Sequence, residues 1–307
     1  MKACIDIGGT KVAVSLNTGA GLDLVGRRSE PTAKTGTNDA LARQVIRMVD
    51  EACAETGMDP SRVQRAGVSS AGPFVLRAGL VELASPNICG GLAGPARGLP
   101  NDWMTAALEA PLRHRFAEVR VENDAVAALE AERRWGALQG YEHCAFVTWS
   151  TGVGTGLCVD GRVLRGKNGN AGHAGHMFVS DNDDALCGCG NVGDLEALVA
   201  GSAVERRLGA DAATLLQRAQ AGDGEAAAIV DELCRVLGRG LYNLVATLDL
   251  QRISLGGSVF WNNREYLLPR LRSQVAMHLP ALTAGCELVP AGLENRVGDY
   301  AALALVA

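Results

Sequence analysis

Two segments combine glycines with side chains that bind phosphate or a divalent cation. Asp6 to Lys11 reads Asp-Ile-Gly-Gly-Thr-Lys, and Ser150 to Gly156 reads Ser-Thr-Gly-Val-Gly-Thr-Gly. Glycines let backbone N–H groups approach an anion, while Thr10 offers a hydroxyl and Lys11 a positive charge. Asp6 could also hold the water shell of Mg²⁺. Either segment alone is equally compatible with a β-hairpin that turns at glycine, but the pair favours two phosphate cradles.

A carboxylate at the end of a strand is a candidate general base. Glu122-Asn123-Asp124 stands between a strand-like run, 119–121, and a helix-like run, 124–137. Asn and Asp are preferred helix caps, so the residues alone favour a simple N-cap. The functional alternative is that Asp124 takes a proton from a substrate hydroxyl, because ligands of α/β sheets bind outside the carboxyl ends of the strands.

The third group of reactive side chains has the composition of a metal site. His176, Cys187, Cys189 and Asp194 lie within a loop-like stretch, and imidazole, thiolate and carboxylate are all zinc ligands. Together, these four side chains would complete a tetrahedral zinc site. The alternative is a pair of free loop thiols.

One further glycine pattern is set aside. Gly161 to Asn168 nearly matches the phosphate loop of nucleoside triphosphatases, but Asn168 stands where the motif needs Ser or Thr. Its glycines also lie in expected hairpin turns rather than before a helix.

The elements around these groups indicate two similar α/β halves. A strand, a glycine turn and a second strand occur at residues 4–16 and again at 144–159. We interpret this as a weak internal duplication, with the glycine turns facing each other across a cleft. Apolar residues at helical spacing predict helices over 39–54 and 225–248, and a strand over 253–255 ends at Gly256-Gly257.

Composition narrows the class of protein. The 307 residues suit two domains, and 48% hydrophobic with 21% charged residues is typical of a globular chain. A net charge of −5 without a basic block argues against nucleic-acid binding, and no apolar run has the length of a membrane helix. Nine cysteines without a secretory signal predict reduced thiols in a cytoplasmic protein.

Taken in order, the motifs resemble those of the ROK family of bacterial repressors and sugar kinases. Those that carry the resemblance are Asp6-x-Gly-Gly-Thr-Lys, Gly72-Pro73, Asn123-Asp124, Thr151-Gly-Val-Gly-x-Gly, Gly175-His176, Cys187-x-Cys-Gly-x-x-Gly193 and Gly256-Gly257. The resemblance implies a two-domain actin-like ATPase fold of the ribonuclease H type, with an interdomain cleft. We expect a small domain at 1–121, on which a C-terminal helix at 297–307 packs back. A larger domain at 122–296 would then carry the zinc-type loop 176–196 and the nucleotide site.

The resemblance also implies roles for individual residues. Asp124 matches the catalytic base for the sugar 6-hydroxyl. The resemblance therefore favours the catalytic role of Asp124 over the simple N-cap that the residues alone favour. Matches to sugar-contacting positions are Gly72, Asn123, Asp124, His173, His176 and Glu196. Matches to nucleotide-binding positions are Asp6, Gly8, Gly9, Thr10, Lys11, Thr151, Gly152, Gly154, Gly256 and Gly257. His176, Cys187, Cys189 and Asp194 match the zinc ligands.

Three positions depart from the family pattern. Asp194 stands at a usual cysteine, so zinc is expected to bind more weakly or to be absent. His173 stands at a usual glutamate, so recognition of sugar hydroxyls near carbons 1 and 2 must differ, and Ala71 replaces the first proline of a Pro-Gly-Pro turn. A neutral histidine offers one acceptor, and a protonated one offers none.

The sequence therefore predicts an ATP- and Mg²⁺-dependent hexose kinase with a structural zinc ion, resembling glucokinases and expected to be a homodimer. Mannose, fructose, N-acetylglucosamine and N-acetylmannosamine remain open as substrates. A binding protein without turnover is an alternative, as is a sugar-sensing transcription regulator. The regulator is disfavoured because the Asp6 motif leaves no room before it for a helix-turn-helix.

Overall fold

The computed structural model describes residues 1–19, 21–92, 98–181 and 185–307, and it divides into two compact units. Unit 1 consists of Met1–Ala131, Arg165–Ala171 and Gly298–Ala307; unit 2 consists of Glu132–Leu164 and Gly172–Val297. The division differs from the expected one at residue 122. Strand β8 (Glu118–Asn123) runs on directly into helix α3 (Asp124–Trp135), whose first two turns stay with unit 1.

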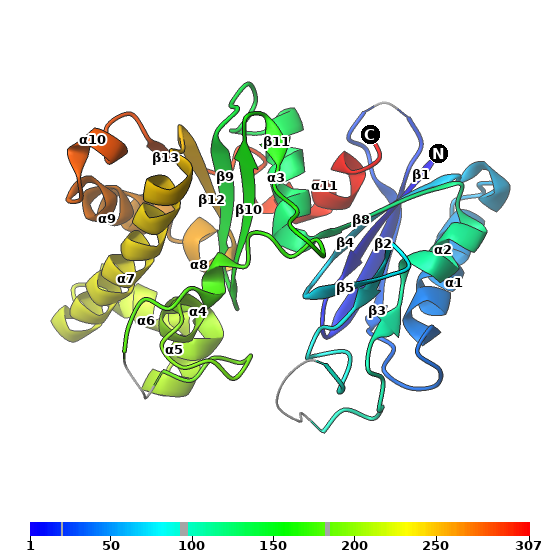
Figure 1. Ribbon diagram of the computed structural model, residues 1–307, viewed down its shortest axis with the longest axis horizontal. Helices are drawn as coiled ribbons and strands as arrows, with labels where there is room; N and C mark the ends of the chain where they lie inside the picture. Colours follow the sequence, from blue (N-terminus) through cyan, green and yellow to red (C-terminus); the bar gives the residue numbers. More distant parts are fainter. Residues whose placement is uncertain (20, 93–97, 182–184) are drawn as a thin grey trace. The chain divides into compact units, whose positions relative to one another are not determined.

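Unit 1 is built on a five-stranded sheet and a smaller three-stranded one (Figure 1). Besides β8, its strands are β1 (Lys2–Ile7), β2 (Lys11–Asn17), β3 (Val25–Pro31), β4 (Arg65–Ser70), β5 (Phe74–Arg77), β6 (Leu80–Leu83) and β7 (Ala106–Ala107). The larger sheet has the order β3-β2-β1-β4-β8, in which β1, β4 and β8 are parallel.

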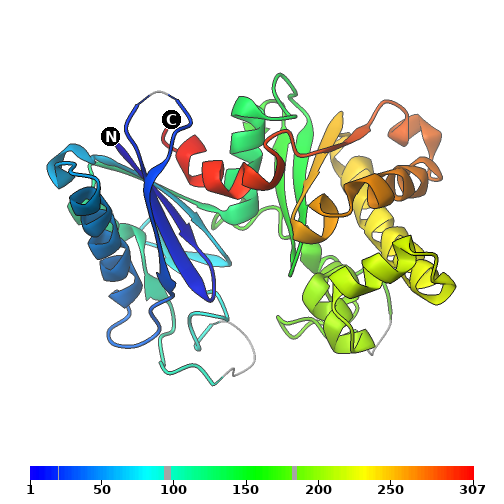
Figure 2. The same cartoon turned by 180° about the vertical axis from the view of Figure 1, so that it is seen from behind.

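Helices cover both faces of the larger sheet of unit 1. On one face, alternate residues of β1 such as Ile5 and Ile7 are buried in a core shared with α1 (Ala40–Glu55) and α2 (Glu109–Arg115). On the other face lies α11 (Val297–Ala304), drawn in red in Figure 2. A Cβ built on Gly67 of β4 would lie 1.9 Å from the carbonyl oxygen of Ala302, so only glycine admits this helix so close to the strand.

Unit 2 repeats the same sheet plan. Its strands are β9 (Cys144–Trp149), β10 (Val153–Val159), β11 (Arg162–Val163), β12 (Arg252–Gly256) and β13 (Glu287–Pro290). The order is β11-β10-β9-β12-β13, with β9, β12 and β13 parallel and β10 antiparallel to β9. Position by position this is the order and direction of the unit 1 sheet, so the predicted internal duplication is present in the topology.

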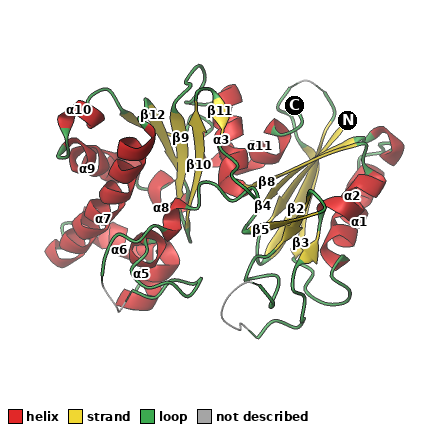
Figure 3. Cartoon of the chain, in the orientation of Figure 1, coloured by secondary structure: helices red, strands yellow, loops and turns green. Residues whose placement is uncertain are grey.

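The helices of unit 2 pack on this sheet and on each other (Figure 3). They are α4 (Leu195–Val199), α5 (Gly201–Leu208), α6 (Ala212–Gln220), α7 (Gly224–Leu248), α8 (Ser258–Trp261), α9 (Arg264–Ala276) and α10 (Pro280–Thr283). The long helix α7 begins where the Asp223 carboxylate accepts the N–H groups of Glu225 and Ala226. Among the described residues, no helix is both long and apolar enough to cross a bilayer.

The predicted elements are found with small shifts at their ends. The helix expected over 39–54 is α1, and its N-cap residue is Asp39, whose side chain makes no capping hydrogen bond. The helix expected to run to Ala137 ends at Trp135. There Gly136 turns the chain, and the Ala137 N–H donates to the side chain of Glu132, 2.9 Å away.

Candidate functional site

The parallel strands of unit 1 bring several predicted site residues to one edge of the sheet. Ile7 of β1 is paired with Ser70 of β4, and Ser70 is paired with Asn123 of β8, so the three strands end level with one another. Asp6, Gly72 and Asp124 therefore belong to the same carboxyl edge, which is where an α/β sheet binds ligands. The Ala71 N–H donates to the carbonyl of Ile7 at 2.9 Å and fixes the start of the Gly72 turn on β1.

At this edge, the Asn123 and Asp124 side chains share one helix N–H as acceptors but differ in burial. Asn123 is buried, and its Oδ1 accepts the N–H of Ala125 at 3.1 Å, which makes it a capping side chain. Asp124 is the first residue of α3 and is solvent-exposed, with one carboxylate oxygen 2.8 Å from the same N–H. The positive end of the helix dipole stabilises the ionised form of a carboxylate placed there.

The turn from Gly8 to Lys11 is a closed hairpin. The Gly8 N–H donates to the Lys11 carbonyl at 2.8 Å, and the hydroxyl of Thr32 donates to the Gly8 carbonyl at 2.7 Å. Thr10 and Lys11 are exposed on the turn, so both side chains are accessible to an anion. The hairpin and cradle interpretations are compatible here, because the hydrogen bonds that close the turn leave these side chains accessible.

Asp6 stands beside this turn and is electrostatically linked to Asp124. The side chain reaches solvent on one side, but surrounding atoms partly desolvate its carboxyl group. This desolvation, followed by the negative charge of Asp124, raises the pKa of Asp6 to about 6. A carboxyl group with a raised pKa beside a second carboxylate is typical of a site that moves a proton or binds a hydrated cation.

The glycine turn of unit 2 is held from behind by Glu196. Oε2 of Glu196 accepts the N–H of Val153 at 2.9 Å, and a Cβ built on Gly152 would lie only 2.7 Å from this oxygen. The hydroxyl of Ser202 donates to the carbonyl of Thr151 at 2.7 Å. The turn is shorter than expected, because β10 begins at Val153 and places Gly154 in the strand, opposite Thr148.

A pocket of about 540 Å³ opens next to this turn within unit 2. It lies between α5, α6 and α8, and its wall includes Thr151 of the glycine turn together with Ser258, which follows Gly256 and Gly257. The remaining lining combines apolar carbon with amide, hydroxyl and carboxylate groups, from Gly201, Ser202, Glu205, Asp211, Ala212, Ala213, Leu216, Gln217, Gln220, Val259, Asn262 and Asn263. A pocket of this size and mixed polarity suits a small organic ligand.

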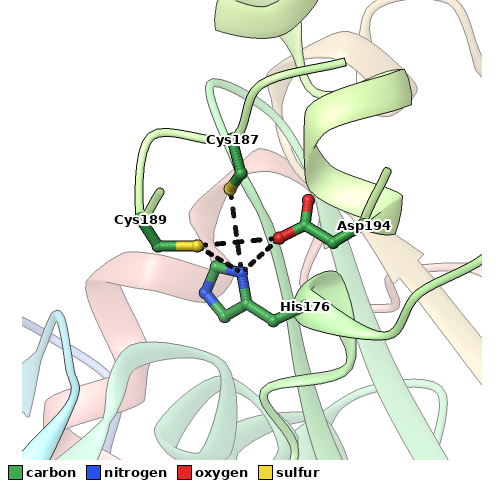
Figure 4. Close-up of side chains that lie close together, drawn as sticks. All are labelled: His176, Cys187, Cys189 and Asp194. Atoms are coloured by element: carbon green, nitrogen blue, oxygen red, sulfur yellow. Dashed lines mark hydrogen bonds and ion pairs between the residues drawn. The ribbon is translucent and has the colours of Figure 1, made fainter. Parts of the chain in front are cut away.

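His176, Cys187, Cys189 and Asp194 come together as the sequence predicted. One potential ligand atom from each lies within 4.8 Å of the others (Figure 4). His176 Nδ1 is 3.1 Å from Asp194 Oδ2, 3.8 Å from Cys187 Sγ and 3.6 Å from Cys189 Sγ, and Cys189 Sγ is 3.7 Å from Asp194 Oδ2. Zinc bond lengths predict tetrahedral edges of about 3.3 to 3.8 Å for such ligands, so the set fits zinc.

The side chains of this cluster are partly desolvated and interact with one another. Burial raises the pKa of the Cys187 thiol far above its usual value, so a bound metal ion is what would ionise it. The hydrogen bond with Asp194 raises the pKa of His176, against the effect of burial. Asp194 is fully buried, and its other oxygen, Oδ1, caps α4 by accepting the N–H of Ala197 at 2.7 Å.

Three predicted sugar-contacting residues, His173, His176 and Glu196, lie within unit 2. The rings of His173 and His176 are stacked with centroids 6.1 Å apart, at either end of the short turn 173–176. Glu196 lies between the glycine turn and the metal cluster, since Cys187 Sγ is 3.6 Å from its Oε1 while Oε2 holds Val153.

Sequence reasoning missed three features. The pocket lining comes from three helices whose polar residues follow no motif. Glu132, a fully buried carboxylate, accepts the N–H groups of Ala137, Gly292 and Leu293 and the hydroxyl of Ser254. The loop Arg165–Ala171 belongs to unit 1, although the strand before it belongs to unit 2. The only local sequence signals near this interaction are the glycines at 136 and 292. Glycine is common in turns, so these two did not indicate a buried carboxylate.

Comparison with known proteins gives a family and an activity. The family model described as "ROK family" matches residues 2–307. The chain is 30% identical to a glucokinase from Aeropyrum pernix, over 98% of this chain and 95% of the relative. It is 34% identical to an N-acetylmannosamine kinase from Salmonella newport, over 83% of this chain and 82% of that relative. The crystal structure of a ROK hexokinase from Thermus thermophilus matches with a TM-score of 0.76 at 32% identity, covering 99% of this chain and 97% of the other.

Proposed function

We propose, since this chain belongs to the ROK family, that it transfers the γ-phosphate of ATP to the 6-hydroxyl of a hexose, with glucose as the preferred acceptor. Its similarity over nearly the whole length to sugar kinases of known name makes it a sugar kinase with the two-domain actin-like ATPase fold. The observation that supports the specific reaction is the exposed carboxylate of Asp124 at the N-terminus of α3, at the carboxyl edge of the unit 1 sheet.

In this proposal, Asp124 is the general base. A base must be ionised and accessible, and the N-terminus of α3 favours the ionised form while solvent exposure leaves the carboxylate open to a hydroxyl. Proton removal typically contributes 10²–10⁴-fold to a rate, whereas alignment of the reacting groups can contribute about 7–11 kcal/mol. The residues that hold the sugar, including Gly72, Asn123, His173, His176 and Glu196, therefore carry the larger share.

Unit 2 supplies the nucleotide site in the same proposal. The pocket beside Thr151 and Ser258 has room for a nucleoside, and the backbone around Gly152, Gly256 and Gly257 would bind the phosphates. In unit 1, Asp6, Thr10 and Lys11 are the side chains placed to bind a hydrated Mg²⁺ and the terminal phosphate. Mg²⁺, when bound, neutralises the charge that develops on the transferred group.

Zinc has a structural role in this account. His176, Cys187, Cys189 and Asp194 would hold it, and the ion would fix the loop that carries His176 next to α4, which carries Glu196. We also propose that the protein is cytoplasmic and forms a homodimer. Light scattering of the purified chain would test the dimer.

N-acetylmannosamine is the second candidate substrate. The 34% identity to a kinase of that sugar favours it, and His173 leaves open how the substituent on carbon 2 is recognised. The deciding experiment is ADP release with a panel of glucose, mannose, fructose, N-acetylglucosamine and N-acetylmannosamine, with ³¹P NMR to identify the phosphorylated oxygen. Glucose with the highest kcat/KM supports the proposal, and no ADP release with any sugar contradicts it.

A further inference from the structure

The loop Arg165–Ala171, which we call the strap, includes the false phosphate-loop sequence around Gly166 and Lys167. The Ala171 N–H donates to the carbonyl of Arg165 at 3.0 Å, so the two ends of the strap are joined. The chain enters the strap after β11 and leaves it directly into Gly172 and His173. The strap itself packs with unit 1, whereas the residues directly before and after it belong to unit 2. Its position therefore depends on its contacts with unit 1.

Asn170 attaches the strap to the segment that follows Gly72. Its Oδ1 accepts the N–H of Phe74 at 2.7 Å, and its Nδ2 donates to the carbonyl of the same residue at 2.8 Å. One side-chain amide thus satisfies both backbone groups of Phe74, as a neighbouring strand would. Phe74 is buried in the core of unit 1 and begins β5, so Asn170 fixes the exit of the Gly72-Pro73 turn.

Arg165 attaches the other end of the strap to the segment that precedes Asp124. Its guanidinium group donates to the carboxylate of Glu122 in β8 and, at 3.2 Å, to that of Glu130 in α3. Glu122 stands two residues before Asp124. About half of the Arg165 side chain is exposed, so this ion pair contributes less than the partly buried bonds of Asn170.

We propose that the strap positions the sugar site, with Asn170 as the principal positioning residue and Arg165 as a secondary one. The inference rests on the proposed function, because the two segments that the strap fixes are the ones assigned to the sugar. Asn170 acts through the backbone of Phe74 and touches neither substrate. Its loss releases the Gly72 turn while the nucleotide site in unit 2 is unchanged, so the effect falls on sugar binding.

The test compares Asn170→Ala with Asn168→Ala, a matched change in the same strap. Among the described residues, the structure gives Asn168 no side-chain hydrogen bond. We expect N170A to raise the KM for sugar about tenfold, because both hydrogen bonds that hold the exit of the Gly72 turn are lost. The KM for ATP should stay within twofold and kcat within threefold, and N168A should match the wild type. Should N170A fail to fold, Asn170→Asp carries the test, since it keeps the size and the acceptor and loses only the donor.

A second readout does not depend on activity. In N170A the Phe74 N–H loses its acceptor, so its hydrogen exchange, followed by NMR, should accelerate at least tenfold, while N168A leaves it unchanged. An active wild type whose sugar KM is unaltered by N170A, or an unchanged exchange rate at Phe74, would overturn this proposal alone. A wild type without sugar-dependent ADP release contradicts the proposed function instead.

Discussion

The two units build the same five-stranded sheet, but the residues at the carboxyl ends of their parallel strands differ in chemistry. In unit 1, β1 ends at Asp6-Ile7, and β8 leads into Asp124 at the start of a helix. In unit 2, β9 leads into Thr151 and Gly152, and β12 ends at Gly256. Carboxylates suit proton removal and cation binding, whereas a triphosphate needs uncharged backbone donors nearby. A duplicated scaffold can thus serve two ligands by changing only the strand ends.

The chain after the last strand of each sheet shows the same contrast. After β8, the N–H of Ala125, the second residue of α3, donates to both Asn123 and Asp124, and Asp124 is exposed. After β13, the N–H groups of Gly292 and Leu293 go instead to Glu132, a carboxylate with no exposed surface. One acid is exposed, and the other is fully buried and holds the loop through its hydrogen bonds. Burial and hydrogen bonding, not residue type, separate the two roles.

The strongest challenge to this comparison is the removal of the accessible acid. Asp124→Asn should lower kcat at least 10²-fold, with the dissociation constant for sugar changed by less than about fivefold, because the amide keeps the shape but cannot accept a proton. Steady-state kinetics and calorimetry measure the two quantities. Asp160→Asn, an exposed acid in a hairpin turn of unit 2, is the control and should behave as wild type. Near-normal kcat in D124N would remove Asp124 from the role of base.

Metal loss should affect unit 2 and leave the carboxylates of unit 1 in place. We expect near-stoichiometric zinc in protein purified without added metal, and a 10- to 100-fold weaker zinc affinity in Asp194→Asn, since the amide can still cap α4 but is a poor ligand. Competition with a chromophoric chelator measures the affinity. Less than about 0.2 zinc per wild-type chain would remove the metal from the account, because a structural site should be nearly full.

A glycine tests the nucleotide half of the comparison. In Gly152→Ala, the new methyl group collides with Glu196 Oε2 and breaks its bond to the Val153 N–H. The KM for ATP should rise about tenfold, and the KM for sugar should rise less. Gly224→Ala adds a methyl group at the start of α7, where nothing lies within 4 Å, and should leave both constants unchanged. Equal kinetics for the two variants would exclude the glycine turn from nucleotide binding.

The smallest expected effect is electrostatic and lies within unit 1. Because the charge of Asp124 helps to raise the pKa of Asp6 to about 6, Asp124→Asn should lower that pKa toward its ordinary value. A raised acid pKa means that the native state binds the proton more tightly than the unfolded state, so stability falls as pH rises from about 4 to 6. This slope should be shallower in D124N. Carbon NMR titration of Asp6 measures the shift, and an unchanged midpoint would show that the two groups do not interact.

Much of this arrangement could be predicted from the sequence because it depends on local signals. Strand runs that end in glycine marked β1, β9 and β12, and the repeated order of strand, glycine turn and second strand indicated the duplication. Cys187 and Cys189 are separated by one residue, so their proximity needed no tertiary knowledge, and His176 and Asp194 border the same loop. Gly154 was assigned to a turn because glycine content does not say where the strand pairing begins.

Features that depend on tertiary packing could not be predicted in this way. The pocket takes its wall from α5 and α6 and from α8, which follows α6 by almost 40 residues, and polar residues on helices usually face solvent. Glu132 resembles any acidic residue near a helix end until Gly292 and Leu293 are brought to it. The strap shows the same limit, since its Gly166-Lys167 sequence matched a false motif while its real partner, Phe74, lies far away in the chain.

The packing of α11 on β4 has a consequence for biosynthesis. The contact between Gly67 and Ala302 joins the first third of the chain to residues that the ribosome translates only after all of unit 2. Domains usually fold in the order in which they emerge, but one sheet face of the earlier unit must here wait uncovered until the later unit has been made. Chaperones that protect exposed apolar surface on nascent chains would therefore meet this protein through its amino-terminal half.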